Sequence, residues 1–419
     1  MDAEILATGE EIRTGILIDS NSAHIAQRLQ EIGARVQRHT AVGDDLDVLA
    51  EVLGEMAGRC DVAVVTGGLG PTVDDLTAAA AAKAAGVHLT HDRTAMQSIE
   101  AFFAARKRPM NPSIRKQALL PEGSACLVNP VGTAPGFELT VDRCQFFFLP
   151  GVPFEMRRML EDRVIPRIIE LQGDKRRFYL SKTLSVFGLT ESITGEHLSD
   201  LASVFPGIQL GLRAKFPEIQ VKLYASAAAQ AQLNKRLEEA GRWVIQRLGD
   251  KVFSDRGKPM EEVVGSLLRN TNSSVAVAES CTGGLIGHLL TNVAGSSDYF
   301  LLSAVTYSNA AKVNVLHVPQ SILETFGAVH EEAAKAMAEG ARQLAGATFG
   351  LATSGIAGPS GGTPDKPVGT VCIGLATPEK AFGRRFNFSY PDRWMNKKMF
   401  AMTALDLLRR ELLTVKYGD

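Results

Sequence analysis

The sequence has few cysteines and aromatic residues, and almost no net charge. Its five cysteines among 419 residues form no C-x-x-C pair, so we expect neither a disulfide framework nor a thiolate zinc site. The 45 basic and 46 acidic residues give a formal net charge of -1, which provides no basic field for direct nucleic-acid binding. No apolar run approaches the ~18 residues that span a bilayer, and the acidic start, Met1-Asp2-Ala3-Glu4, is unlike a secretion signal. We therefore expect a cytoplasmic protein that acts neither at a membrane nor directly on nucleic acid.

The composition is that of a globular protein with several hydrophobic cores. Hydrophobic residues make up 45%, charged residues 22%, and the mean hydropathy is +0.02. Residues 1–172 and 258–419 alternate short β-rich runs with amphipathic helical stretches, which predicts α/β domains with parallel sheets flanked by helices. After a charged patch at Asp174 to Arg177, residues 176–252 have a different order of strands and helices and predict a small α+β domain.

A glycine-rich loop follows a buried strand in the first domain. The apolar run Val62 to Val65 leads into Gly67, Gly68 and Gly70, and a helix is expected to begin shortly afterwards. Glycines at such a junction let the backbone approach a ligand, and free N–H groups there can hold phosphate. The simpler alternative is a tight turn in which Asp74 or Asp75 caps the helix.

The wider pattern carries a resemblance. The string from Thr66 to Thr77 resembles the pterin-phosphate loop of the MoaB/MogA fold. Together with residues 7–11 and 129–136, it resembles the N-terminal domain of the CinA family. The resemblance implies a three-layer domain that splits ADP-ribose into AMP and ribose 5-phosphate with a divalent metal. It also implies these ADP-ribose contacts: Gly67, Gly68, Gly70, Thr72, Asp75, Asn129, Gly132 and Thr133.

Two acidic positions are candidates for the metal. Pyrophosphate cleavage develops negative charge on the bridging oxygen, and a carboxylate-held cation can neutralise it. Asp75 is the first candidate, as metal ligand or base, and Asp44 matches the second acidic position of the MoaB/MogA pattern. Asp44 and Asp45 are equally suited to capping the helix that begins near Leu46. The chain has Ile114 where the family usually has asparagine, which predicts weaker binding if that asparagine contacts the ligand.

The middle segment resembles the small KH-like domain of the same family. A nucleic-acid-binding KH domain needs a G-x-x-G clamp. Gly207 and Gly211 are one residue too far apart for it. We expect a structural or dimerising module, and the family resemblance implies a homodimer.

The third domain places a hydroxyl at a strand-to-helix junction. The strand Val275 to Ala278 leads into Glu279-Ser280-Cys281-Thr282-Gly283-Gly284, where backbone N–H groups could stabilise an oxyanion. Ser280 could also be an N-cap, and Cys281 is a competing nucleophile. No histidine lies close by in sequence, so a desolvated Lys312, acting directly or through Tyr307, is the candidate base.

With residues 353–362 and 366–371, these motifs resemble the CinA C-terminal domain. The resemblance implies a deamidase that hydrolyses the carboxamide of nicotinamide mononucleotide (NMN) to nicotinic acid mononucleotide and ammonia. Ser280 matches the nucleophile, and Tyr307 and Lys312 match the proton-transfer pair. The implied NMN contacts are Thr282, Gly283, Gly284, Asn309, Gly355 and Arg393, with Arg393 at the phosphate. No metal is expected in this domain, because its histidines lack ligand spacing.

Two other functions fit parts of the pattern. The loop at Gly67 alone is compatible with nucleotidyl transfer to molybdopterin. The family's association with competence and DNA damage is compatible with a non-enzymatic adapter for DNA-uptake or recombination proteins.

Overall fold

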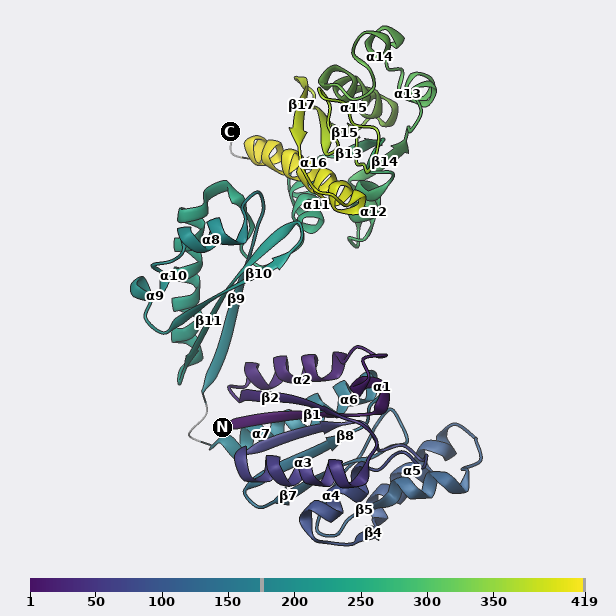
Figure 1. The fold of residues 1–419 in the computed structure, drawn as a ribbon, viewed down its shortest axis with the longest axis vertical. Coiled ribbons are helices and arrows are strands. Elements are labelled where there is room, and N and C mark those ends of the chain that lie inside the picture. Colours follow the sequence, from purple (N-terminus) through teal and green to yellow (C-terminus); the bar gives the residue numbers. More distant parts are fainter. Residues whose placement is uncertain (174–176, 417–419) are drawn as a thin grey trace. The chain divides into compact units, whose positions relative to one another are not determined.

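The computed structural model describes residues 1–173 and 177–416 (Figure 1). The expected start of the middle domain at residue 176, and most of the charged patch before it, lie outside these residues. Contacts divide the chain into two compact units, Met1–Leu180 with Ala225–Arg236, and Ser181–Tyr224 with Leu237–Asp419. None of the described helices combines the length and apolarity needed to cross a membrane.

Unit 1 is built on a six-stranded sheet in the order β2-β1-β3-β8-β7-β6. The first four strands in that order are parallel neighbours: β2 (Arg35–Val42), β1 (Asp2–Thr8), β3 (Val62–Thr66) and β8 (Cys144–Leu149). All five residues of β3 are buried, as expected for a central strand covered on both faces.

Helices cover both faces of this sheet and make three layers, as the sequence predicts (Figure 1). One face packs on α2 (Ser20–Glu31), α6 (Pro153–Met159) and α7 (Ile165–Gln172) through a core that includes Ile25, Met156 and Ile168. The other face packs on α3 (Leu46–Arg59), α4 (Thr77–Ala85) and α5 (Arg93–Ala105) through Leu53, Ala80 and Ile99.

The sheet is mixed, whereas the sequence pattern predicts a parallel one. β7 (Gly136–Val141) runs antiparallel to β8, and β6 (Ala125–Leu127) runs antiparallel to β7. Only Asp142 and Arg143 connect β7 to β8. So short a connection can join only antiparallel strands, because a parallel pair needs a long crossover.

A small α+β module comes next along the chain. Most of its residues belong to unit 2, and residues 178–180 and 225–236 belong to unit 1. Its sheet has the order β10-β11-β9-β12, formed by β10 (Ile208–Lys215), β11 (Glu218–Ala227), β9 (Phe178–Val186) and β12 (Val252–Ser254). The helices of this module are α8 (Glu191–His197), α9 (Leu201–Val204) and α10 (Gln230–Leu248).

The rest of unit 2 is a five-stranded sheet in the order β14-β13-β15-β16-β17. β13 (Val275–Glu279) lies parallel between β14 (Phe300–Val305) and β15 (Phe349–Gly355). β16 (Thr370–Ala376) pairs antiparallel with β15, and β17 (Ala381–Asn387) antiparallel with β16. A short turn joins β16 to β17, whereas residues 356–369 join β15 to β16.

Two helical layers enclose this sheet. α11 (Met260–Asn270), α12 (Leu285–Thr291) and α16 (Arg393–Lys416) form one core with it. α13 (Asn309–Leu316), α14 (Gln320–Phe326) and α15 (Glu331–Ala345) form the other. The carboxyl ends of β13 and β14 therefore lie side by side, and they bring Ser280 and Tyr307 to one edge of the sheet.

Candidate active sites

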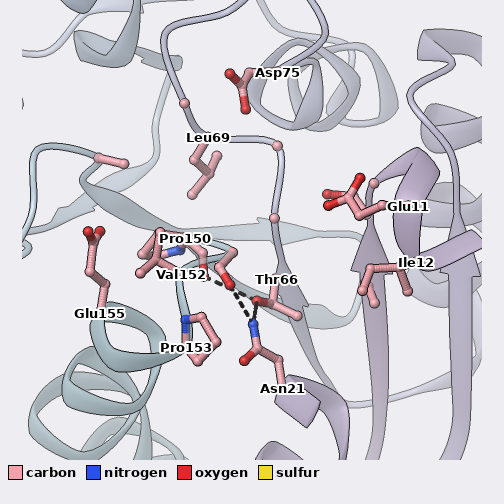
Figure 2. Close-up of a pocket in the computed structure, with 18 of the residues that line it drawn as sticks. Glu11, Ile12, Asn21, Thr66, Leu69, Asp75, Pro150, Val152, Pro153 and Glu155 are labelled. Atoms are coloured by element: carbon pink, nitrogen blue, oxygen red, sulfur yellow. Dashed lines mark hydrogen bonds between the residues drawn. The ribbon is translucent and has the colours of Figure 1, made fainter. Parts of the chain in front are cut away.

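A cavity of about 480 Å³ lies at the carboxyl ends of β1 and β3 in unit 1 (Figure 2). Of the predicted ADP-ribose contacts, Gly67, Gly68, Gly70, Asp75 and Thr133 line it, and so does the second metal candidate, Asp44. Its volume falls in the range of small-molecule sites.

The glycine-rich loop has a backbone that only glycine adopts easily. Gly68 has a φ of +64°, and a Cβ there would collide with the Thr77 hydroxyl, which donates to Gly67 O at 3.0 Å. Within the described chain, the N–H groups of Gly68, Leu69 and Gly70 donate to no protein acceptor. The loop therefore offers several free donors to a phosphate.

Asp75 holds this loop rather than capping a helix. Its carboxylate accepts the Thr72 N–H at 2.8 Å and the Thr72 hydroxyl. The N-cap of α4 is Leu76, which makes no side-chain cap. Lys116 also stabilises this turn, because its Nζ donates a hydrogen bond to the Asp75 carbonyl oxygen at 2.9 Å.

Other carboxylates surround Asp44. Burial raises the pKa of Asp44, the Glu10 N–H that it accepts at 3.1 Å opposes this, and Glu11 and Asp74 raise the pKa further. The neighbouring Asp45 caps α3 by accepting from Asp47 and Val48. The predicted capping role thus belongs to Asp45, and Asp44 faces the cavity.

The donor set suits a hydrated divalent cation. The cavity is lined by Glu11, Asp44, Asp74, Asp75 and Glu155, so an anionic ligand would need a counter-charge there. No group of three described His, Cys, Asp or Glu residues converges on one point. Mg²⁺ commonly binds through one or two carboxylates plus substrate phosphates, and Asp44 with Glu11 or Asp74 would provide the protein's share.

Two buried amides in the cavity have unpaired oxygens. The Asn21 amide nitrogen donates to Gly151 O at 2.8 Å and to Thr66 Oγ1 at 3.1 Å (Figure 2), and that of Gln117 donates to Leu69 O at 3.2 Å. Among the described residues, neither amide oxygen has a hydrogen-bond partner. Buried acceptors without partners are costly, and both oxygens are closed to solvent, so a ligand donor reaches them only if the lining moves. Sequence analysis missed both residues.

The other three predicted contacts, Asn129, Gly132 and Thr72, do not line the cavity. Asn129 is buried, accepts the N–H groups of Val131 and Gly132, and donates to Glu155 at 2.7 Å. Thr72 is the partner of Asp75. Ile114 packs against the core, so the departure from the family pattern at this position lies away from the cavity lining.

The second site brings Ser280 and Lys312 together. Lys312 Nζ lies 3.3 Å from Ser280 Oγ, 2.9 Å from the Thr306 carbonyl oxygen and 3.1 Å from the Tyr307 carbonyl oxygen. Lys312 is 1% exposed, and burial lowers its pKa. A neutral amine has two N–H donors for the two carbonyls and one lone pair, which is free to accept from the Ser280 hydroxyl.

Glu279 fixes the turn that carries Ser280. It is fully buried, and its carboxylate accepts the N–H groups of Gly284, Ile286 and Gly287 at 2.9 to 3.1 Å. The Gly283 N–H donates to Ser280 O. Within the described residues, the N–H groups of Cys281 and Thr282 donate to no oxygen acceptor. Both face the Cys281 sulfur, which is a weak acceptor, so these two are the candidate oxyanion donors, whereas the N–H groups of Gly283 and Gly284 are occupied.

Cys281 is a poor nucleophile here. It is buried, and burial raises its pKa to about 12. The thiolate is the reactive form, so Ser280 is the stronger candidate.

Tyr307 faces away from this pair. Its side chain is 63% exposed, and its hydroxyl accepts from Arg393 at 3.2 Å. Arg393 also donates to Gly358 O at 2.6 Å. No hydrogen bond among the described residues joins the Tyr307 phenol to Ser280 or Lys312. Tyr307 and Arg393 thus form a polar group at the rim, and Tyr307 contacts Lys312 through its backbone.

A second cation, Lys397, lies over the turn that carries Ser280. A Cβ built on Gly283 would be 3.4 Å from Lys397 Nζ. Lys397 is one helical turn after Arg393 on α16, so the two cations lie on the same side of the helix. Sequence analysis missed Lys397, although the i, i+4 spacing from Arg393 was a usable signal.

The remaining predicted NMN contacts differ in how deeply they are buried. The Thr282 and Thr353 hydroxyl oxygens are 2.7 Å apart and buried. Gly355 packs tightly on Thr370 and Val371 of β16, which explains its lack of a side chain. Asn309 is exposed at the first turn of α13.

Three families match successive parts of the chain. Residues 4–170 match the probable molybdopterin binding domain, residues 181–254 the damage-inducible protein CinA KH domain, and residues 257–412 the CinA C-terminal domain.

Whole proteins are similar as well. A CinA-like protein of Desulfosudis oleivorans is 54% identical over 413 residues, covering 99% of this chain and 100% of that protein. One of Desulforapulum autotrophicum is 46% identical and covers 99% of each chain. A solved CinA structure of unknown function from Thermoplasma acidophilum is 34% identical, covers 40% of this chain and 99% of its own, and has a TM-score of 0.38. With such identity over nearly its whole length, the chain belongs to the CinA family.

Proposed function

We propose that unit 2 hydrolyses the carboxamide of NMN to nicotinic acid mononucleotide and ammonia, with Ser280 as the nucleophile. The observation that carries the proposal is the 3.3 Å approach of a buried lysine to a serine hydroxyl. A lysine of lowered pKa is a suitable base for serine where no histidine is at hand.

The residues supply each proton transfer. Ser280 Oγ attacks the carboxamide carbon while its proton passes to Lys312 Nζ, and the Cys281 and Thr282 N–H groups hold the oxyanion. The C–N bond then breaks, and Lys312 protonates the leaving nitrogen to give ammonia. A water molecule attacks the ester, Lys312 takes its proton and returns it to Ser280 Oγ. The acid product and the free serine result.

Binding of the substrate phosphate falls to the cations of α16. Arg393 and Lys397 lie on adjacent turns beside the catalytic turn. An arginine fork and a lysine ammonium are both good phosphate partners.

Ammonia release from NMN tests this proposal. Ser280→Ala should lower kcat/KM by roughly a thousandfold or more. Cys281→Ala, which changes the adjacent side chain, should keep most of the activity. Ammonia release that survives in Ser280→Ala but is lost in Cys281→Ala would move the nucleophile to the thiol.

A second function is favoured by the cavity of unit 1, which we assign to hydrolysis of ADP-ribose to AMP and ribose 5-phosphate. The free N–H groups of the glycine-rich loop would hold the diphosphate. When bound, a divalent cation would neutralise the charge that develops on the bridging oxygen.

AMP release from ADP-ribose tests this assignment. Asp75→Asn keeps an oxygen that can accept from Thr72 but removes the carboxylate charge that strengthens these bonds, and it should lower kcat/KM by roughly tenfold or more. Asp45→Asn retains a good N-cap outside the cavity and is the matched control. Equal rates in the two variants would show that Asp75 does not shape the site.

A further inference from the structure

Unit 2 has a second cavity that is separate from the Ser280 site. It has a volume of about 600 Å³ and is lined both by the α+β module and by the strands and helix of the larger domain. Five aromatic side chains line it: Phe187, Phe216, Phe386, Phe388 and Tyr390. Neither proposed activity uses it.

The aromatic walls are held in place by the surrounding structure. Phe216 packs edge-on against Tyr390, with ring centroids 5.0 Å apart. Phe388 stacks at 6.2 Å on Phe386 and also contacts Phe400 of the core. Rings fixed in this way provide a preorganised surface for a planar ligand.

The charges around the cavity favour an anion. Its two carboxylates are already paired, Glu218 with Lys215 at 2.9 Å and Asp406 with Arg409 and Arg410 at 2.7 Å. Two further lining cations, Lys251 and Arg384, pair with no carboxylate among the described residues. The lining thus has uncompensated positive charge beside apolar rings.

We propose that this cavity binds a small planar aromatic anion, with its ring between the aromatic side chains and its acidic group at Lys251 and Arg384. The volume suits such a ligand, because small-molecule sites usually measure about 300 to 1,000 Å³. An apolar aromatic wall beside a few charged groups is typical of ligand sites.

A pair of fluorescent probes separates the two parts of the proposal. 8-Anilinonaphthalene-1-sulfonate has an aromatic body and a sulfonate, and N-phenyl-1-naphthylamine has the same body without the charge. Both are titrated against the full chain, and against variants whose folding is checked by circular dichroism.

The charge-reversing double variant Lys251→Glu with Arg384→Glu should weaken the tightest sulfonate site by roughly fivefold or more and leave the neutral probe unchanged. Arg385→Glu is the matched control. This residue is next to Arg384 on β17 but does not line the cavity, and the variant should change neither affinity.

A third variant tests the aromatic body of the site. Ala214 is exposed and lines the cavity, so Ala214→Trp should fill the space without disturbing the core and should weaken both probes. Sulfonate binding that is unchanged in the double variant, or equally weakened in Arg385→Glu, would overturn the proposal. So would unchanged binding of both probes to Ala214→Trp.

Discussion

The burial of Lys312 lowers the pKa of its amine, which suits it to act as a base, and it also reduces the stability of the folded chain. Its ammonium form would be desolvated beside β14, and folding therefore favours the neutral amine. The same burial that makes Lys312 a usable base opposes folding at neutral pH, as is common for active-site residues.

The pH dependence of stability follows from this burial. Between the lowered pKa of Lys312 and the ordinary value near 10.4, the unfolded chain binds one proton more than the folded chain. The free energy of unfolding of the wild type, measured relative to that of Lys312→Met, should therefore increase as the pH rises through that window. The rise should be about 1.4 kcal/mol for each unit by which burial lowers the pKa.

Urea denaturation at pH 7 and pH 9.5 measures this difference. Lys335→Met removes a lysine that is partly exposed on α15 and serves as the control. If both variants changed with pH in the same way as wild type, the folded chain would hold Lys312 with an ordinary pKa.

Which site residues could be predicted depended on how far their partners lie along the chain. Ser280 and Lys312 were predictable, because Ser280 directly follows β13, Lys312 lies in the first turn of the helix after β14, and parallel strands end at one edge of a sheet. The orientation of the Tyr307 side chain was not predictable, because its hydrogen-bond partner Arg393 is 86 residues away in the sequence. The unpaired oxygens of Asn21 and Gln117 were not predictable either, because the partners of these two amides are distant in sequence.

At the scale of elements, the junction of β13 with α12 is the feature that positions the nucleophile. Glu279 ends the strand and accepts three N–H groups from the start of the helix. It also accepts from the Ser303 hydroxyl of β14 at 3.2 Å. A single buried carboxylate thus links two strands, the turn and the helix.

Glu279→Gln should therefore damage both stability and catalysis. The amide keeps one acceptor oxygen and sets an NH₂ group against backbone donors, which should cost about 1 to 3 kcal/mol. A misplaced Ser280 should also lower kcat/KM for NMN by roughly tenfold or more. Urea denaturation and ammonia release measure the two effects.

Glu262→Gln is the control for this prediction, because Glu262 forms only a partly exposed ion pair with Lys258 at 3.3 Å. If Glu279→Gln unfolded at the same urea concentration as this control and kept full activity, the capping network would not position Ser280.

The order of elements was largely predictable, but the direction of the outer strands was not. Buried runs such as Val62 to Val65 give a clear signal for central strands. From composition, β7 and β16 are equally compatible with parallel strands. A short turn to β8 decides the direction of β7, whereas residues 356–369 between β15 and β16 allow either direction for β16. Both glycine-rich junctions were recognisable, whereas the particular N–H groups left free at each depend on side chains such as Glu279.

At the scale of the whole molecule, the chain combines two units with different candidate chemistries. Each has its own sheet and hydrophobic cores, and each carries its candidate site at the carboxyl ends of parallel strands, where ligands bind in open α/β sheets.

Calorimetry should therefore show that each ligand stabilises its own unit. ADP-ribose with Mg²⁺ should raise the unfolding temperature of unit 1, and NMN that of unit 2. A ligand at 100 times its Kd should add about 2.7 kcal/mol to its unit. Ser280→Ala prevents turnover of NMN during the scan, and Asp75→Asn identifies the transition of unit 1. A single transition that moves equally with both ligands would contradict the independence of the units.

The most direct test of the central claim, that buried Lys312 activates Ser280, is the pH profile of ammonia release from NMN. The account predicts that kcat/KM rises with pH to a plateau, with an apparent pKa below the ordinary ~10.4 of lysine, and that Lys312→Met abolishes release at every pH. No release from the folded wild-type chain, or release by Lys312→Met with the same pH profile, would contradict it.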